Sequence, residues 1–288
     1  MERCPNCSRE VSEIQVMCPT CGTYLGPPNV RATGKREERE ALEARYLAAL
    51  EQSKIDGCES EVVDFDESMR KTSAVVNVDL DFLYTFITNE KALYTTYELG
   101  VEGQARIPAQ PEDDSDRRTV GAIIFSKNAK EMRYAALSLD GAGLKSYGPY
   151  ALRFKEITIA GRATLLEENS YSFVSKHNVK SLREIPPGYR ALWDERNKLA
   201  VAKLSGKVSA GTTEAEHSKI LMADTGDRAT DEFIEIHIYG RFNIDSIESV
   251  RGSSSITEKI KKLKKLKKAQ ISIVQDYLKA AGQEWVEE

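Results

Sequence analysis

The sequence predicts an α+β protein with a small cysteine-rich unit at its N-terminus, a mixed α/β domain in the middle and a basic helix at its C-terminus. Three observations support this division: two closely spaced cysteine pairs, short strand-like apolar runs between helix-like segments, and a long lysine-rich helical pattern near the end. We expect boundaries at residues 1–26, 27–57, 58–252 and 253–288, where the second segment is a linker followed by an amphipathic helix.

The bulk composition limits the class of protein. The chain has 288 residues, of which 41% are hydrophobic, which is enough for one medium domain with small appendages. It contains no uncharged apolar run of about 18 residues and no apolar run after its first residues, so we expect no membrane span and no secretion signal. These features predict a cytoplasmic protein with reduced thiols. A net charge of −4 excludes a uniform polycation.

The cysteine spacing predicts a metal site. Cys4 and Cys7 form one Cys-x-x-Cys pair, Cys18 and Cys21 form another, and ten residues separate the pairs. Two such knuckles supply four tetrahedral thiolates, the arrangement of a structural Zn²⁺ site. A rubredoxin-like iron site is the alternative, because iron also accepts four thiolates. The segment resembles the short zinc ribbons at the ends of many prokaryotic proteins.

The zinc ribbon has no open ligand position, so we expect no catalysis there. It is too short to bury a core, and metal binding must therefore supply its folding energy. Its role remains open between a stabilising or dimerising cap and a contact with nucleic acid or a partner protein. Chelation is expected to unfold residues 1–25 and to leave chemistry elsewhere unchanged, unless the ribbon delivers an acceptor.

Periodicity predicts the remaining elements. A single cysteine, Cys58, is expected to be a partly buried thiol, and a polar, acidic surface loop is expected at residues 108–118. Helices are expected over residues 36–54, 81–91, 189–204 and 256–282, and strands over residues 75–80, 120–125, 135–139, 150–154 and 232–239.

The strand around Glu235 is the most informative segment of the middle domain. Side chains alternate between the faces of a strand, so Ile234, Ile236 and Ile238 are expected in the core. Glu235, His237 and Tyr239 then share the opposite face. Three polar groups on one face are typical of a cleft wall, but solvated residues at a sheet edge give the same pattern.

Residues 130–252 resemble the bacterial and phage ADP-ribosyltransferase-like superfamily. The similarity lies in Leu144–Lys155, in Gly161–Ser170 and in the strand at Glu235. Members share a Tyr-Gly strand, an Arg-x-Thr strand that leads to a Gly-Asp-Ser-type turn, and a late strand with a Glu-x-Gln or Glu-x-His step that ends in Gly. The turn reads Glu168-Asn169-Ser170 here, which keeps the serine and lacks the glycine and the aspartate.

The resemblance implies a domain with split antiparallel sheets and a cleft for the co-substrate NAD. It makes Arg133 a candidate for binding the NAD pyrophosphate, with Arg162 as a competitor, because a guanidinium fits that group. It makes Ser170 or the nearby Ser172 a candidate for holding the nicotinamide ribose or supporting the catalytic glutamate. A surface role for Arg133 and a simple turn role for Ser170 remain open.

The resemblance also implies the catalytic residues and the activity. Glu235 would stabilise the oxocarbenium-like transition state as nicotinamide leaves, and His237 would orient the acceptor. The expected function is an NAD-dependent ADP-ribosyltransferase, acting as a toxin or antiphage effector on nucleic acid or on a protein of the translation apparatus. A toxin of this kind would have a neutralising partner protein.

The C-terminal lysines keep a second function open. Seven lysines lie within Lys259–Lys268. This pattern fits a solvated helix packed on the domain, a helix that binds the phosphate backbone of nucleic acid, or a contact with an acidic partner or second copy. A membrane surface is disfavoured, because the apolar face has few large aromatic residues. The alternative function is thus a non-enzymatic zinc-ribbon protein that binds RNA or another nucleic acid, or acts as a scaffold.

Overall fold

The computed structural model describes residues 2–89, 92–94 and 111–288, with side chains in the last range described from residue 118. The helices are α1 (Pro28–Thr33), α2 (Arg36–Ile55), α3 (Glu59–Arg70), α4 (Leu80–Thr88), α6 (Pro111–Phe125), α7 (Glu156–Ile159), α8 (Ser170–His177), α9 (Arg196–Leu204), α10 (Glu214–Leu221) and α11 (Lys261–Ala280). The strands are β1 (Glu2–Arg3), β2 (Glu10–Val11), β3 (Ser73–Val78), β4 (Met132–Ser138), β5 (Tyr150–Phe154), β6 (Ala163–Leu166), β7 (Arg190–Leu192), β8 (Glu235–Tyr239), β9 (Ile247–Gly252) and β10 (Glu284–Glu287).

One mixed sheet of eight strands forms the centre of the molecule. Its order is β10-β9-β5-β3-β4-β8-β6-β7, and among the strands of the described residues only the β9–β10 pair is parallel. The expectation of split sheets is therefore wrong for the described residues, because β3 pairs with both β4 and β5 and joins the two halves. Strands β1 and β2 form a separate two-stranded ribbon near the N-terminus.

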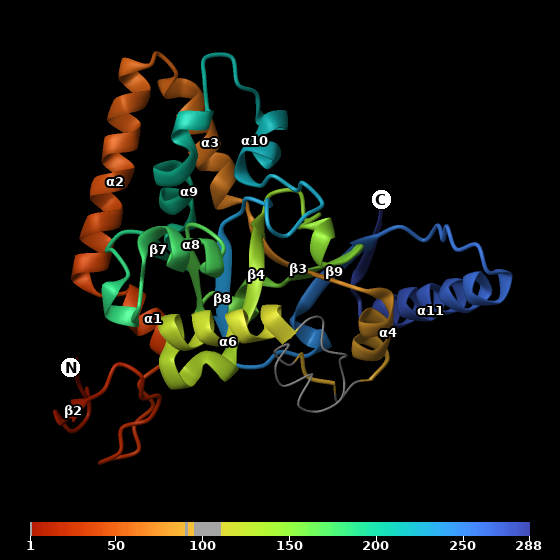
Figure 1. Ribbon diagram of the computed structural model, residues 1–288, viewed down its shortest axis with the longest axis horizontal. Helices are drawn as coiled ribbons and strands as arrows, with labels where there is room; N and C mark the ends of the chain where they lie inside the picture. Colours follow the sequence, from red (N-terminus) through yellow and green to blue (C-terminus); the bar gives the residue numbers. More distant parts are fainter. Residues whose placement is uncertain (1, 90–91, 95–110) are drawn as a thin grey trace.

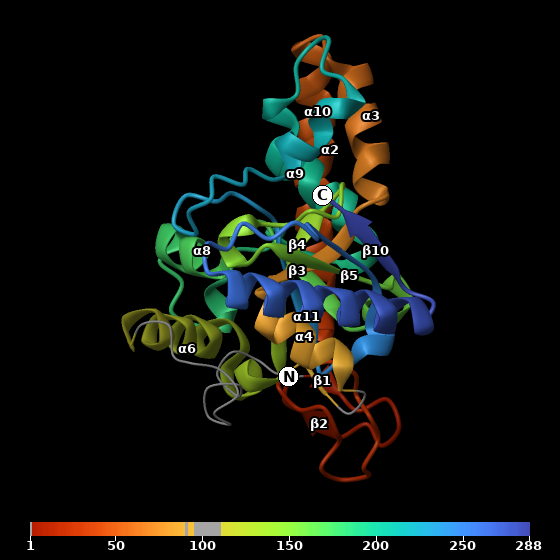
Figure 2. The ribbon, with the colours of Figure 1, turned by 90° about the vertical axis from the view of Figure 1, so that its right-hand side faces the viewer.

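Helices cover both faces of this sheet (Figure 1). On one face, α2, α3 and α9 pack together beside one half of the sheet, and α4 and α11 lie side by side over the other half (Figure 2). The main hydrophobic core lies between these helices and the strands, and it includes Ile234, Ile236 and Ile238, as predicted. A smaller cluster on the opposite face joins α6 and α8 to Met132 and Leu166.

Two of the predicted helices follow from their amphipathic patterns. Helix α2 agrees with its prediction to within one residue and buries Leu42. Helix α11 buries Ile271, Val274 and Leu278 against α4 and the sheet. It begins at Lys261, five residues later than expected, and residues 256–260 are not helical.

Other predictions are wrong or partly outside the described residues. The apolar run at residues 120–125 is the end of helix α6 and not a strand. Residues 111–118 of the expected loop belong to the same helix, and residues 108–110 lie outside the described residues. The expected helix at residues 189–204 instead contains β7, a short 3₁₀ turn and α9. Helix α4 ends at Thr88, and residues 90–91 are not described.

Candidate functional sites

The four N-terminal cysteines form a candidate metal centre. Their sulfur atoms all lie within 4.8 Å of one another, and the Cys4–Cys21 and Cys7–Cys18 Sγ distances are both 3.6 Å. Tetrahedral thiolates about 2.3 Å from a metal lie roughly 3.8 Å apart, so the sulfur positions fit one closed four-thiolate site. A hydrogen bond from the Thr23 hydroxyl lowers the pKa of the Cys21 thiol to about 6, which favours its thiolate form.

Each of the two Cys-x-x-Cys knuckles contains the same kind of backbone turn. The amides of Ser8 and Gly22 donate to the carbonyls of Cys4 and Cys18, in both cases at 2.9 Å. Both donor residues have positive φ angles, 57° for Ser8 and 70° for Gly22. Glycine adopts this conformation without strain, so the second knuckle has the residue that the turn favours and the first tolerates a serine.

The polar face of strand β8 lies in the interior of the sheet. Strand β8 pairs with β4 on one side and β6 on the other, so it is not a solvated edge. The register places His237 opposite Tyr134 and Thr164, and Glu235 opposite Ala136 and Leu166. Glu235 and His237 are 5% and 2% exposed. Because both side chains are buried on an interior strand, Glu235 and His237 are not solvated residues at a sheet edge.

The Glu235 carboxylate accepts hydrogen bonds from the start of helix α8. Its Oε1 accepts from the Ser170 hydroxyl and from the Ser170 amide at 3.2 Å, and its Oε2 accepts from Asn169 Nδ2 at 3.3 Å. Asn169 is the N-cap residue of α8, and its Oδ1 accepts from the Tyr171 amide. The positive end of the helix dipole therefore adds to the stabilisation of a negative charge at Glu235.

His237 completes this group of side chains. Its Nε2 lies 2.8 Å from Glu235 Oε1 and 3.0 Å from the Ser170 hydroxyl. The edge of the imidazole packs against Phe125 and Tyr134, with ring centroids 4.8 and 5.4 Å away. We call Asn169, Ser170, Glu235 and His237 the Glu235 cluster. A buried carboxylate fixed beside a hydroxyl and an imidazole can stabilise positive charge and exchange a proton through the imidazole.

The structure separates the two candidate serines. Ser170 is buried inside the Glu235 cluster, whereas Ser172 is exposed on α8. Ser170 thus contacts Glu235, and Ser172 lies on the solvent-exposed side of α8.

Arg133 lies on the opposite face of the sheet from the Glu235 cluster. It pairs with Ile238 in the register, and its buried side chain points toward the main core. Its Nε donates to the Tyr94 carbonyl at 3.4 Å, and Glu131 lies 3.6 Å from one terminal nitrogen. Both terminal nitrogens are buried without a hydrogen-bond acceptor among the described residues. Burial lowers the pKa of this guanidinium.

The Arg162 guanidinium binds backbone carbonyls near the ends of strands. Its Nε donates to the Thr158 carbonyl at 2.7 Å, and its Nη1 donates to the carbonyls of Tyr239 and Arg241 at 3.0 and 2.8 Å. This guanidinium caps backbone groups at the end of β8. Neither candidate arginine thus joins the Glu235 cluster in this arrangement.

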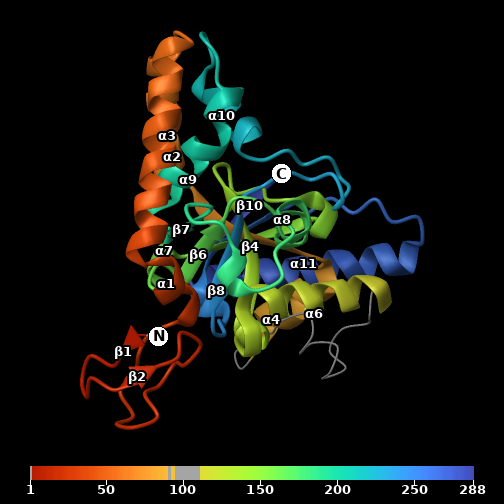
Figure 3. The same cartoon turned by 60° about the vertical axis from the view of Figure 1, so that its left-hand side comes forward.

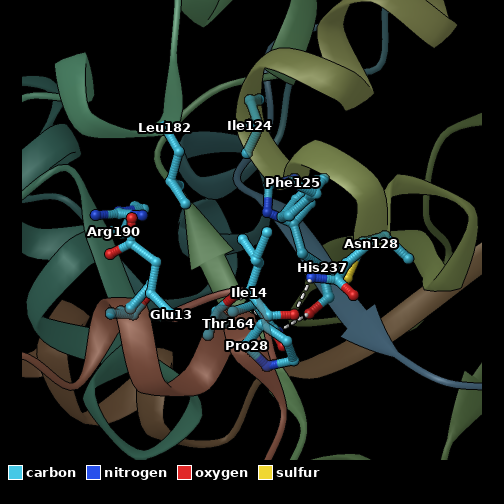
Figure 4. A pocket seen from close by; sticks show the side chains of 14 residues that line it. Glu13, Ile14, Pro28, Ile124, Phe125, Asn128, Thr164, Leu182, Arg190 and His237 are labelled. Carbon is cyan, nitrogen blue, oxygen red and sulfur yellow. Dashed lines mark hydrogen bonds between the residues drawn. The ribbon is translucent and has the colours of Figure 1, made fainter. Parts of the chain in front are cut away.

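The sequence did not point to Asn29, which lies on helix α1 beside the same face. Its Nδ2 donates to the carbonyls of Arg162 and His237, both at 3.1 Å, and to the Thr164 hydroxyl at 3.2 Å. A narrow pocket lies next to it, between α1, the N-terminal segment, α6 and β8, and His237 forms part of its wall (Figure 4). An asparagine after Pro-Pro is a common linker signal, and only the folded chain shows this bridging role.

No protein-family model matches the chain, and a comparison with curated proteins finds no match. In the part of the chain that the structure describes, no helix has the length and apolar content needed to cross a bilayer.

Proposed function

We propose that the chain is an NAD-dependent ADP-ribosyltransferase whose chemistry depends on Glu235. The observation that carries the proposal is the Glu235 cluster, in which a buried glutamate is held by a serine and a histidine on one face of an interior strand. The pattern of residues 130–252 supports it, because the resembling superfamily uses a late-strand glutamate and a preceding serine for this reaction.

The proposed reaction is a group transfer at the nicotinamide ribose. The bond between C1′ and the nicotinamide nitrogen breaks, and nicotinamide leaves with the electron pair. A nucleophilic atom of the acceptor bonds to C1′ and loses its proton, for which His237 is the candidate base. The Glu235 carboxylate stabilises the positive charge that develops on the ribose. Ser170 and Asn169 hold the carboxylate in place, and neither predicted arginine has a role in this scheme.

The test is transfer of labelled ADP-ribose from NAD, together with nicotinamide release, by the full-length protein with and without RNA, DNA or ribosomes. Glu235→Gln is the informative variant, because it keeps the shape of the side chain and removes its charge. Glu248→Gln is the matched control, since Glu248 lies on β9 and pairs with Arg153 at the surface. Release that is lost in Glu235→Gln and kept in the control supports the proposal. No release under any condition, or equal release in both variants, overturns it.

The four-cysteine centre is proposed to hold a structural Zn²⁺ ion. Four converging thiolates fit Zn²⁺ or iron, and a closed shell leaves neither an open position for substrate. Metal analysis of the purified protein distinguishes the two. One equivalent of zinc without visible absorbance supports the assignment, and a coloured iron–thiolate spectrum overturns it.

The biological setting remains part of the same proposal. A cytoplasmic toxin or antiphage effector that modifies nucleic acid or a protein of the translation apparatus would need a neutralising partner. The experiment above includes both acceptor classes and therefore identifies which one receives the label.

A second candidate function is nucleic-acid binding without catalysis, and helix α11 favours it. Five lysines at the start of this helix and just before it are exposed: Lys259, Lys261, Lys262, Lys265 and Lys268. In the described part of the chain, only Lys267 of the seven lysines forms an ion pair, with Glu258 at 3.2 Å. Clustered, unpaired lysines release counterions when they bind a phosphate backbone.

The salt dependence of binding tests this second function. Five lysines that each contact one phosphate of single-stranded RNA predict a slope of about −3.5 in a plot of log K against log salt. Replacing Lys261, Lys262 and Lys265 with glutamine should reduce the slope by about 2. Replacing Lys54 and Lys71, which lie at the far ends of α2 and α3, is the control. Unchanged binding in the α11 variant would exclude this helix as the binding surface.

A further inference from the structure

Helix α1 lies against the sheet face that carries the Glu235 cluster, and the cysteine segment projects from the N-terminal end of α1 at the edge of the molecule (Figure 1). We call residues 2–34 the N-terminal cover. Helix α1 contacts β6 and β7, and the cysteine segment continues from it along the same side of the molecule (Figure 3). Ile14 of the cysteine segment, Phe125 of α6 and His237 of β8 line one common pocket (Figure 4). The cover is therefore a wall of the space beside the proposed active site.

Two asparagines hold the cover against the rest of the chain, together with an ion pair between Glu13 and the exposed Arg183 at 3.5 Å. Asn29 donates to acceptors on and beside β6 and β8, as described above. Asn128, in the 3₁₀ turn after α6, donates to the Ile14 carbonyl at 2.9 Å. Within the cover, Arg31 joins α1 to the cysteine segment through the carbonyls of Ser12, Glu13 and Gln15 and the Glu2 carboxylate. The cover is thus tied together as one piece.

The cysteine segment is the more loosely packed part of the cover, since four of the six residues of α1 are buried. Cys4, Val11 and Cys18 form a small apolar cluster that is separate from the three described clusters of the main domain. The named contacts of the cysteine segment with the main domain are largely polar, and polar contacts can be exchanged for contacts with water. Segments with few buried apolar contacts to their neighbours open at a lower free energy than the core does.

Among the described residues, the pocket beside His237 is too small for a substrate. The pocket offers about 20 Å³ to the centres of water-sized molecules. That is room for on the order of one ordered water, and a nicotinamide or adenine ring does not fit. Asn29 Oδ1 is buried in this wall without a hydrogen-bond donor among the described residues. A buried oxygen without a hydrogen-bond donor is better satisfied when the wall opens and water or a ligand donates to it.

From these contacts we infer that the N-terminal cover is an autoinhibitory lid beside His237, at one end of the Glu235 cluster. In the closed state it excludes substrate from His237, and release of the Asn29 and Asn128 contacts opens the site. The consequence for turnover rests on the proposed transferase function, but the opening itself does not. The inference also changes the expected effect of chelation: loss of the metal should loosen the lid and expose His237.

The test measures the accessibility of His237 without NAD. Full-length Asn29→Ala/Asn128→Ala is treated with diethylpyrocarbonate, and modification of each histidine is followed by mass spectrometry. Asn243→Ala is the control, because the described side-chain bond of Asn243 is to nearby Asp245 and Asn243 does not line the pocket beside His237. His217 is the internal reference, since it is fully buried against α3. The metal content and circular dichroism of each variant report whether the fold is intact.

The expected result is faster modification of His237 by about tenfold or more in the double variant, since each lost hydrogen bond shifts an opening equilibrium several-fold. His217 should keep its parent rate. An unchanged rate at His237 overturns the lid, as does an equal increase at His217, which would mean that the whole domain was loosened. Because the readout needs no NAD, failure here is distinguishable from failure of the transferase proposal. If both hold, the double variant also releases nicotinamide faster than the parent.

Discussion

Two serines two residues apart provide a direct test of the Glu235 cluster. Ser170→Ala removes a hydroxyl that contacts both the Glu235 carboxylate and His237 Nε2, whereas Ser172→Ala removes an exposed hydroxyl from the same turn of α8. Both substitutions delete one oxygen and neither changes the charge. Any difference between them therefore reports the buried contacts and not the composition of the helix.

The magnitude follows from the type of bond that is lost. A hydrogen bond to a charged group contributes about 1.5–3 kcal/mol. Glu235 keeps three donors in Ser170→Ala, namely the Ser170 amide, Asn169 and His237. The carboxylate is thus not left bare, and we expect a loss of about 2 kcal/mol. Ser172→Ala should stay within about 0.5 kcal/mol of the parent.

Urea unfolding of the two variants, followed by circular dichroism, measures the difference. With an m value of about 3 kcal/mol/M, the midpoint of Ser170→Ala should fall by about 0.7 M. Nicotinamide release should drop in Ser170→Ala and persist in Ser172→Ala if the proposed activity holds. Midpoints that differ by less than about 0.2 M would show that the Ser170 contacts do not stabilise the cluster, and the argument for a prearranged Glu235 would fail.

Three further predictions concern other parts of the chain. Arg133→Met should leave nicotinamide release intact and raise stability by about 1 kcal/mol, because it removes a buried cation whose terminal nitrogens have no hydrogen-bond acceptor among the described residues, with only Glu131 nearby at 3.6 Å; a large loss of release would place Arg133 in the active site. Burial lowers the pKa of His217, and the nearby carboxylates of Glu214, Asp64 and Glu216 oppose this shift. As the pH falls, the unfolded chain therefore binds a proton at this imidazole before the folded chain does. Stability should therefore fall below about pH 6.5 by up to about 1.4 kcal/mol per pH unit, and His217→Gln should flatten this dependence in urea titrations at pH 5 to 7.5. Chelation should abolish amide protection in residues 2–25 while α3 and α9 retain theirs in hydrogen exchange, and uniform protection before and after chelation would contradict a metal-dependent fold.

The sequence predicts elements well where one periodicity runs for several turns. Helix α2 and strand β8 match their patterns, because an amphipathic stripe and a strict alternation each have one physical interpretation. The apolar run at residues 120–125 is too short for its periodicity to distinguish a helix from a strand. Val120, Ile124 and Phe125 are spaced for one face of a helix, yet the whole run is also apolar enough for a buried strand. Only packing against α8 and β4 decides between them.

The candidate site was predictable only to the extent that its residues are local in sequence. Alternation places Glu235 and His237 on one face without any knowledge of the fold. Alternation does not predict which side chains of β4 share a face with Glu235 and His237. That depends on the register between β4 and β8, which are about 100 residues apart in the sequence. Arg133 consequently pairs with Ile238 and not with His237. Asn29 escaped notice for the same reason, since its three acceptors lie more than 130 residues away.

The proposed lid and the Glu235 cluster are independent of each other in one respect. All of the described donors to the Glu235 carboxylate come from α8 and β8, and the N-terminal cover contributes none of them. The cover instead contacts the His237 carbonyl and the Thr164 hydroxyl. Opening the lid therefore removes none of the described hydrogen bonds to the Glu235 carboxylate. A site built in this way can be closed without losing the contacts that hold its carboxylate, because the donors to Glu235 and the residues of the cover that line the pocket beside His237 belong to different segments.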